Sequence, residues 1–120
     1  MTRSDKVKRI AIDLDGTITE NYDFKGIWDL TPNQLSNIYR KLKPNNKIIK
    51  IVNKLFNKGY TVFIFTSRSN MYQSITKSWL NKYKVKYHYL VVDKPYYEWI
   101  IDDKSITPEE LIRSEKWKEL

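Results

Sequence analysis

Ile10-Ala11-Ile12-Asp13-Leu14-Asp15-Gly16-Thr17 is the stretch that decides the fold of this chain, because an apolar run ends there in two carboxylates and a turn. Residues two apart on a strand point to the same side, so Asp13 and Asp15 are predicted to face one pocket. Gly16 permits the sharp backbone turn that follows them. We therefore expect a strand over residues 7–13 that delivers an acidic pair at its carboxyl end.

Three later apolar runs also end in polar residues. Tyr60 to Phe65 precedes Thr66-Ser67-Arg68, His88 to Asp93 precedes Lys94, and Trp99 to Ile101 precedes Asp102 and Asp103. The carboxyl ends of parallel strands meet at one edge of an open α/β sheet, which is where such sheets place their sites. The four runs therefore predict four strands and one shared polar site.

Helical patterns separate these runs. Apolar residues recur at helical spacing over 32–42, 47–58 and 70–83, and Thr107-Pro108 begins a fourth, short helix. Thr31-Pro32-x-Gln34 has the pattern of a capping box. Strands that alternate with helices imply parallel pairing and right-handed crossovers. The predicted fold class is α/β, a Rossmann-like open parallel sheet with helices on both faces.

The composition indicates one domain that spans residues 1–120. Hydrophobic residues make up 41% of the chain and aromatic residues 14%, which is typical of a globular domain. The absence of cysteine excludes disulfides and thiolate metal sites. The first residues lack the apolar core of a signal peptide, and no apolar run approaches the ~18 residues of a membrane span. A cytoplasmic protein without a membrane partner is expected.

The basic residues are concentrated in the middle of the chain. The net charge is +8, and the span between Asp29 and Asp93 contains 12 Lys or Arg and no acidic residue. Four of these cations, Lys47, Lys50, Lys54 and Lys58, form a stripe opposite the apolar face of one predicted helix. This pattern favours anionic partners such as phosphorylated metabolites or nucleic acid, and its alternative interpretation is a solvated basic surface.

The order of the motifs resembles the haloacid dehalogenase superfamily of phosphohydrolases over roughly residues 7 to 106. The four motifs of that superfamily would be Asp13/Asp15, Thr66, Lys94 and Asp102/Asp103. Several short sequence segments, among them Asp-Leu-Asp-Gly-Thr and Ile-Asp-Asp-Lys, also resemble those of small capless members found beside capsule and surface-sugar genes. The resemblance implies that residues 18–44 form a hairpin flap and a very small lid in place of a cap domain. Trp28 in that flap would either stack on a substrate ring or pack against its own domain.

The resemblance further implies a phosphomonoesterase that works through an aspartyl-phosphate. Asp13 would be the nucleophile and Asp15 the acid and base in turn, although the spacing alone allows the reverse. The phosphoryl group would be held by Thr66, by the amides of Ser67 and Arg68, and by Lys94, which would also neutralise the nucleophile. The Arg68 side chain would contact either the substrate or only the surface. Mg²⁺, which suits all-oxygen ligands, would be held by Asp13, by the backbone carbonyl of Asp15, by Asp102 and by Asp103, the last of them through water or by orienting its neighbour. His88, in mid-strand, is expected to be a packed core histidine.

The expected substrate is a small phosphorylated metabolite, by preference a sugar phosphate. A polynucleotide 3′-phosphatase or nucleotidase of the same superfamily is the alternative, and a non-catalytic nucleic-acid module is a further one; both draw on the basic central span. A homo-oligomer whose neighbouring subunit completes the small site is compatible with the sequence. A two-component receiver domain uses similar residues but needs an acceptor Asp in mid-chain, and no acidic residue lies between Asp29 and Asp93.

Overall fold

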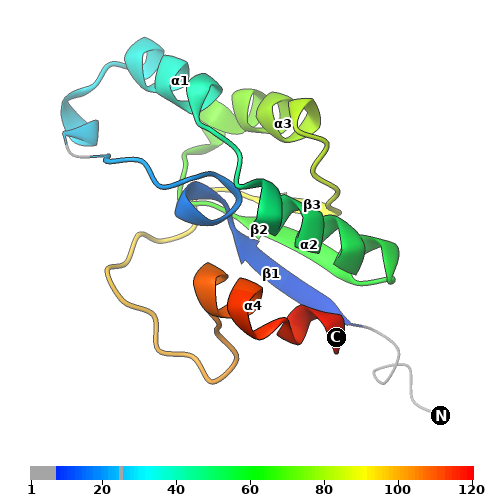
Figure 1. Ribbon diagram of the computed structural model, residues 1–120. Coiled ribbons are helices and arrows are strands. Elements are labelled where there is room, and N and C mark those ends of the chain that lie inside the picture. The colour runs from blue at the N-terminus through cyan, green and yellow to red at the C-terminus, as the bar shows by residue number, and fades with distance from the viewer. Residues whose placement is uncertain (1–7, 25) are drawn as a thin grey trace.

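The computed structural model describes residues 8–24 and 26–120, and its centre is a three-stranded parallel sheet (Figure 1). The strands are β1 (Arg9–Asp13), β2 (Thr61–Phe65) and β3 (Tyr89–Val91), in the order β1-β2-β3. Both neighbouring pairs are parallel. Three of the four predicted strands are confirmed, and Val7, where the first was expected to begin, lies outside the described residues.

All four predicted helices are present: α1 (Pro32–Lys41), α2 (Asn46–Asn57), α3 (Gln73–Lys82) and α4 (Pro108–Ser114). The first turns of α1, α2 and α4 are capped by polar side chains, because the amides at a helix start have no partner within the helix. Thr31 and Gln34 form the predicted capping box, and Asn45 and Thr107 accept hydrogen bonds from the amides of the helices they precede. None of the described helices combines the length and apolar character needed to cross a membrane.

The main core lies between the helices and one face of the sheet. Even-numbered strand residues point into it, and Val62 and Ile64 are fully buried. The helices supply the other side, with buried residues from α2 and α3 and half-buried ones from α4: Ile48, Ile49, Ile51, Val52, Leu55, Trp79, Leu80, Leu111 and Ile112. The apolar stripes that predict these helices are therefore the surfaces that cover the sheet.

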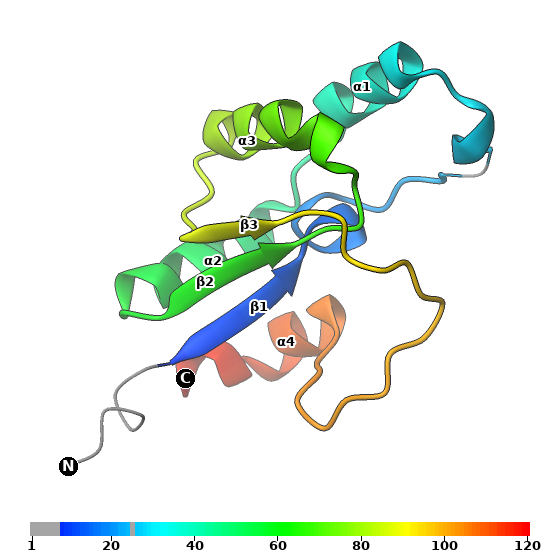
Figure 2. The ribbon, with the colours of Figure 1, turned by 180° about the vertical axis from the view of Figure 1, so that it is seen from behind.

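None of the described helices lies on the opposite face of the sheet. The connections β1 to β2 and β2 to β3 both step in the same direction across the sheet, and right-handed crossovers then place their helices on the same side. Figure 2, seen from behind, shows the three strands in front with α2 and α4 beyond them. The prediction of helices on both faces is wrong for the part of the chain that the structure describes.

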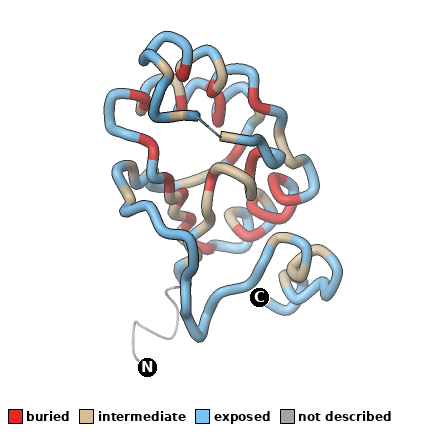
Figure 3. The backbone as a smooth tube through the Cα atoms, turned by 90° about the vertical axis from the view of Figure 1, so that its left-hand side faces the viewer, coloured by how far each residue is buried: buried red, intermediate tan, exposed pale blue. Residues whose placement is uncertain are grey.

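The run Trp99 to Ile101 does not form the predicted fourth strand. Its three side chains are 88%, 56% and 101% exposed, and it belongs to a long connection over residues 92–107, the 92–107 loop, which is pale blue over most of its length in Figure 3. The Asp102 carboxylate accepts a hydrogen bond from the Lys104 amide at 2.8 Å, which turns the chain immediately after the run. Three apolar residues are too few for sequence pattern to separate a strand from a loop.

Residues 19–44 form a closed excursion from the sheet rather than the expected hairpin flap. Its two ends are paired by an antiparallel bridge between Thr19 and Pro44 and by a hydrogen bond from the Glu20 amide to the Lys43 carbonyl at 2.8 Å. Among its described residues the only helices are α1 and a single turn at Ile27–Asp29. The helix α1 packs against α3 in a second small core, so it serves as a lid-like layer.

Truncating a buried apolar side chain should lower the free energy of unfolding far more than truncating an exposed one. Leu55→Ala, at a position 1% exposed, is expected to lower the free energy of unfolding by about 2–5 kcal/mol. Ile101→Ala, at a fully exposed position, should change it by less than about 0.5 kcal/mol. Urea unfolding followed by circular dichroism measures both. A loss of more than about 1 kcal/mol in Ile101→Ala would show that this run is buried, as in a fourth strand.

Candidate active site

Asp13, the first acidic residue of the first motif, ends β1, and the tight turn Leu14–Ile18 that follows carries the second, Asp15. The turn is closed by a hydrogen bond from the Thr19 amide to the Leu14 carbonyl at 3.0 Å. Gly16 has φ +81°, in the left-handed region, and a Cβ there would lie 3.1 Å from the Asn21 side-chain oxygen. Because Leu14 and Ile18 are fully buried, they anchor the turn from below.

The carboxylate of Asp13 pairs with the ammonium of Lys94. Lys94 Nζ lies 3.0 Å from Asp13 Oδ1, and Thr17 Oγ1 lies 3.5 Å from Oδ2. The backbone around Lys94 is fixed to the loop after β2, because its amide donates to the Thr66 carbonyl at 3.0 Å and the preceding Asp93 amide donates to the Arg68 carbonyl at 2.9 Å. The residues after three neighbouring strands therefore meet, as predicted, at one edge of the sheet.

The carboxylate of Asp15 pairs with the guanidinium of Arg68 through both of its oxygens. Arg68 Nη2 lies 2.7 Å from Oδ1, and Nε lies 3.1 Å from Oδ2. Thr66 Oγ1 lies 3.4 Å from the same Oδ2 and accepts a hydrogen bond from the Arg68 amide at 3.1 Å. A bidentate pair of this kind fixes the plane of the carboxylate as well as its position.

Arg68 is held from two further sides by residues that sequence reasoning did not assign to the site. Its Nη1 donates to Thr76 Oγ1 on α3 at 3.0 Å, and its guanidinium carbon lies 3.8 Å from the centre of the Tyr39 ring on α1. The Arg68 side chain, expected either at the substrate or on the surface, is 2% exposed and is an internal partner of Asp15. Tyr39 fits the apolar stripe of α1, and no local pattern indicated its contact with an arginine.

Burial and charge act in opposite directions on the two ionisable groups of the Asp13–Lys94 pair. Burial raises the pKa of Asp13 above its usual value, and the hydrogen bond and charge of Lys94 offset only part of that rise. Burial alone would lower the pKa of Lys94, but its hydrogen bond to Asp13, the Asp13 charge and the neighbouring Tyr97 phenol together outweigh burial and raise it. Burial, first among several influences, raises the pKa of Tyr39 to about 12. Lys94 is therefore a lasting positive charge beside Asp13.

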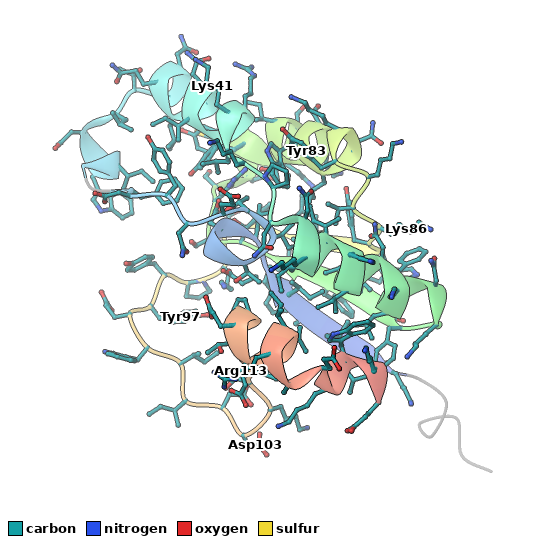
Figure 4. All side chains as sticks on the ribbon, viewed as in Figure 1. Lys41, Tyr83, Lys86, Tyr97, Asp103 and Arg113 are labelled. Atoms are coloured by element: carbon teal, nitrogen blue, oxygen red, sulfur yellow. The ribbon has the colours of Figure 1, made fainter. Side chains whose placement is uncertain are left out.

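The second acidic pair, Asp102 and Asp103, is not brought to this site. Both residues are exposed on the 92–107 loop, and Figure 4 shows Asp103 at the far end of that loop, away from the turn after β1. Among the described residues, no three acidic or histidine side chains gather closely enough to hold a metal ion. The predicted set of Mg²⁺ ligands is therefore not assembled in this arrangement.

Two other predicted residues lie at the margin of the site. Ser67 is exposed between Thr66 and Arg68. His88 is exposed as well, which differs from the predicted core position, but its Nδ1 accepts a hydrogen bond from the Val62 amide at 3.0 Å and its ring stacks on Phe56 at 4.5 Å. These contacts give His88 a structural role at the start of β3.

The fold and the site define an α/β protein with two carboxylate–cation pairs at the carboxyl edge of a parallel sheet. Among solved structures, it resembles a structural-genomics target from Vibrio cholerae with a TM-score of 0.71 and 22% identity, over 94% of this chain and 95% of that one. Two structures of a Pnkp1/Rnl/Hen1 complex, one described as an RNA repair complex, match with TM-scores of 0.56 at 24% and 19% identity.

The matches to that complex cover 91% and 99% of this chain but only 35% and 34% of the chains matched, so this chain spans about a third of their length. No protein-family model and no curated protein matches the sequence. At these identities the likenesses show a shared fold, an open parallel α/β sheet.

Removing the positive charge beside Asp13 should raise the pKa of its carboxyl further. Lys94→Met deletes a hydrogen bond and a charge that both lower this pKa, while burial, which raises it, remains. The carboxylate then takes up its proton at a higher pH than in the unmodified protein. Carbon-13 NMR of the Asp13 carboxyl during a pH titration measures the change. Lys104→Met, on the exposed loop, is the control and should leave the titration as it is; an unchanged or lower pKa in Lys94→Met would contradict the pairing.

The Arg68–Asp15 pair should show strong coupling in a double-mutant cycle. Arg68→Met leaves the Asp15 carboxylate without its bidentate partner and is expected to cost about 3 kcal/mol, the low end for a buried pair because Asp15 is 25% exposed. Adding Asp15→Asn removes the unpaired charge, so the double variant should be less destabilised than the sum of the single variants by about 1–3 kcal/mol. Urea unfolding measures the cycle, and additive costs would show that the pair is not formed in solution.

Proposed function

We propose that this protein is a phosphomonoesterase of the haloacid dehalogenase type, with Asp13 as its nucleophile. The observation that carries the proposal is the position of Asp13: a half-buried carboxylate at the end of β1, 3.0 Å from the Lys94 ammonium and beside the fixed Asp15. Phosphate monoesters need a nucleophile, proton transfer at the leaving oxygen and neutralisation of charge. The residues at this edge of the sheet are of the types that supply all three.

In the first step, an Asp13 oxygen attacks the phosphorus atom and the bond from phosphorus to the ester oxygen breaks. The electron pair of that bond goes to the leaving oxygen, which takes a proton from the acid, and Asp13 becomes an aspartyl-phosphate. Lys94 neutralises charge on both the attacking carboxylate and the phosphoryl oxygens as a compact point charge. The raised pKa of Lys94 keeps that charge in place across the neutral range.

In the second step, water attacks the phosphorus atom and the bond between phosphorus and the Asp13 oxygen breaks, which releases phosphate and restores the carboxylate. Asp15 accepts the proton of the attacking water. Its role as base suits its pairing with Arg68, because a guanidinium with its Nε and Nη2 on the two oxygens orients a carboxylate. Its role as acid in the first step requires that it first takes up a proton.

The Mg²⁺ that the superfamily resemblance implies does not fit the described residues as they stand. The Asp13 carboxylate has the Lys94 ammonium as its partner, and the Asp102 and Asp103 carboxylates lie on the exposed loop. No step above is therefore assigned to a metal ion. The requirement for Mg²⁺ remains a proposal that rests on the resemblance and is measured with the activity.

A small phosphorylated metabolite, by preference a sugar phosphate, is the proposed substrate. This preference rests on the resemblance of the sequence to small capless members of the superfamily. A polynucleotide end is the second candidate, favoured by the fold likeness to chains in an RNA repair complex and by the net charge of +8. Two lysines of α2 are already engaged within the chain, which argues against a nucleic-acid backbone bound along this helix. The Lys54 ammonium lies 4.8 Å from the centre of the Trp117 ring, and Lys58 Nζ donates a hydrogen bond to the Leu120 carbonyl at 3.3 Å.

Phosphate release from a panel of substrates tests both candidates. The panel contains sugar phosphates, nucleoside monophosphates and 3′-phosphorylated oligonucleotides, with and without Mg²⁺. Asp13→Asn should lower kcat by at least about 10³-fold on every substrate that the protein hydrolyses, because the amide cannot form the phosphoenzyme. Glu109→Gln, at an exposed carboxylate on α4 outside the proposed machinery, is the control and should retain activity within about twofold, as expected of a surface substitution.

Full activity in Asp13→Asn would overturn the proposed nucleophile. Hydrolysis of oligonucleotide ends alone, with a steep dependence on salt, would favour the second candidate over a metabolite. A requirement for Mg²⁺ that Asp102→Asn weakens would show that the 92–107 loop approaches Asp13 during turnover. Activity without Mg²⁺ would agree with the two ion pairs as they stand.

A further inference from the structure

The face of the sheet that carries no helix is an apolar surface. It consists of odd-numbered strand residues, which belong to neither of the two cores of the described chain: Ala11, Phe63, Phe65, Tyr89 and Val91. Tyr89 is 56% exposed and Val91 38% exposed, while Phe63 and Phe65 are half-buried. We call these five side chains the open sheet face; it turns toward the viewer in Figure 2.

The aromatic rings of the open sheet face are packed against one another and form a continuous surface. Phe63 stacks on Tyr89 with ring centres 5.0 Å apart and planes 22° apart, and it meets Phe65 edge-on at 6.5 Å. Parallel sheets occur almost only with both faces covered. A contiguous exposed apolar surface of this kind marks a site of interaction.

The charges of the chain favour a contact between copies at this face. The central span with 12 cations and no acidic residue includes α1, α2 and α3, so two copies with a net charge of +8 repel each other through their helical surfaces. The open sheet face contains no ionisable group apart from the Tyr89 phenol. Arg9, the first residue of β1, points to the same side as Ala11 and gives one end of the face a positive charge, while the Asp13 carboxylate at the other end is already paired with Lys94.

We propose that the open sheet face binds a second copy of this chain, face to face, in a two-fold dimer with antiparallel strands. The two-fold axis lies midway between the two sheets, parallel to them and perpendicular to the strands. It therefore places β1 directly over the partner's β1, with the two strands running in opposite directions. The partner's Arg9 then lies toward the Asp13 end of the first copy, and apolar side chains meet in the centre. A self-complementary patch of this kind is what a two-fold interface requires. Stacked sheets lie about 10 Å apart, which the aromatic side chains fill.

This dimer does not depend on the proposed activity, because its test reads the oligomeric state. Sedimentation of the full chain at concentrations from about 1 to 200 μM should show a monomer–dimer equilibrium, as expected for an interface at the small end of the specific range. Tyr89→Lys and Val91→Lys place a charge on exposed positions of the face and should raise the dissociation constant of the dimer by at least about tenfold. Met71→Lys is the matched control, since Met71 is 63% exposed and lies in the single turn Asn70–Tyr72 that precedes α3, and it should leave the constant unchanged within about twofold.

Single-cysteine variants test the geometry, since the natural chain contains no cysteine. Ala11→Cys places one thiol at the exposed centre of β1. In the antiparallel dimer, this thiol and that of the partner face each other across the interface. A bis-maleimide that spans about 10 Å should link Ala11→Cys into a covalent dimer and leave Met71→Cys largely monomeric. A monomer throughout the sedimentation series would overturn the proposal. Equal cross-linking at both positions, or a dimer that Tyr89→Lys and Val91→Lys do not weaken, would overturn it as well.

Discussion

The buried guanidinium of Arg68 is the interaction on which the rest of the site depends. It joins three parts of the chain that are remote in sequence: the turn with Asp15, the helix α1 with Tyr39 and the helix α3 with Thr76. A planar group with five donors can bind a carboxylate with one edge, a hydroxyl with another and an aromatic ring with its face. The position of the acidic pair is therefore fixed by helix packing as well as by the turn after β1.

A second constraint is topological. Two right-handed crossovers that step the same way across a sheet leave their helices on one side. The core on that side contains many apolar side chains, among them Val62, Ile64 and Leu80, which are fully buried between the sheet and the helices. The opposite side is left to Ala11, Tyr89 and their neighbours. The right-handedness of the two crossovers thus accounts for both the core on one side of the sheet and the open sheet face on the other.

Local sequence signals predicted the elements well, and failed where the deciding contacts are not local. Capping residues and apolar spacing indicated all four helices, because each signal lies within one turn of the element it governs. The run Trp99 to Ile101 has the composition of a strand, but a strand also needs a partner edge, and β1 pairs with β2 alone among the described residues. For the same reason Asp102 and Asp103 were expected at a site that they do not reach.

The sequence by itself determined that Asp13, Asp15, Thr66 and Lys94 would meet, because each follows an apolar strand and parallel strands end at one edge. The resemblance implied that Lys94 would lie beside the nucleophile, and Lys94 does pair with Asp13. Tertiary structure alone decided that the Arg68 side chain, expected either at the substrate or on the surface, pairs with Asp15. A cation pairs with the carboxylate that lies within about 3 Å of its charged end. Helix packing and the hydrogen bonds between loops set that distance.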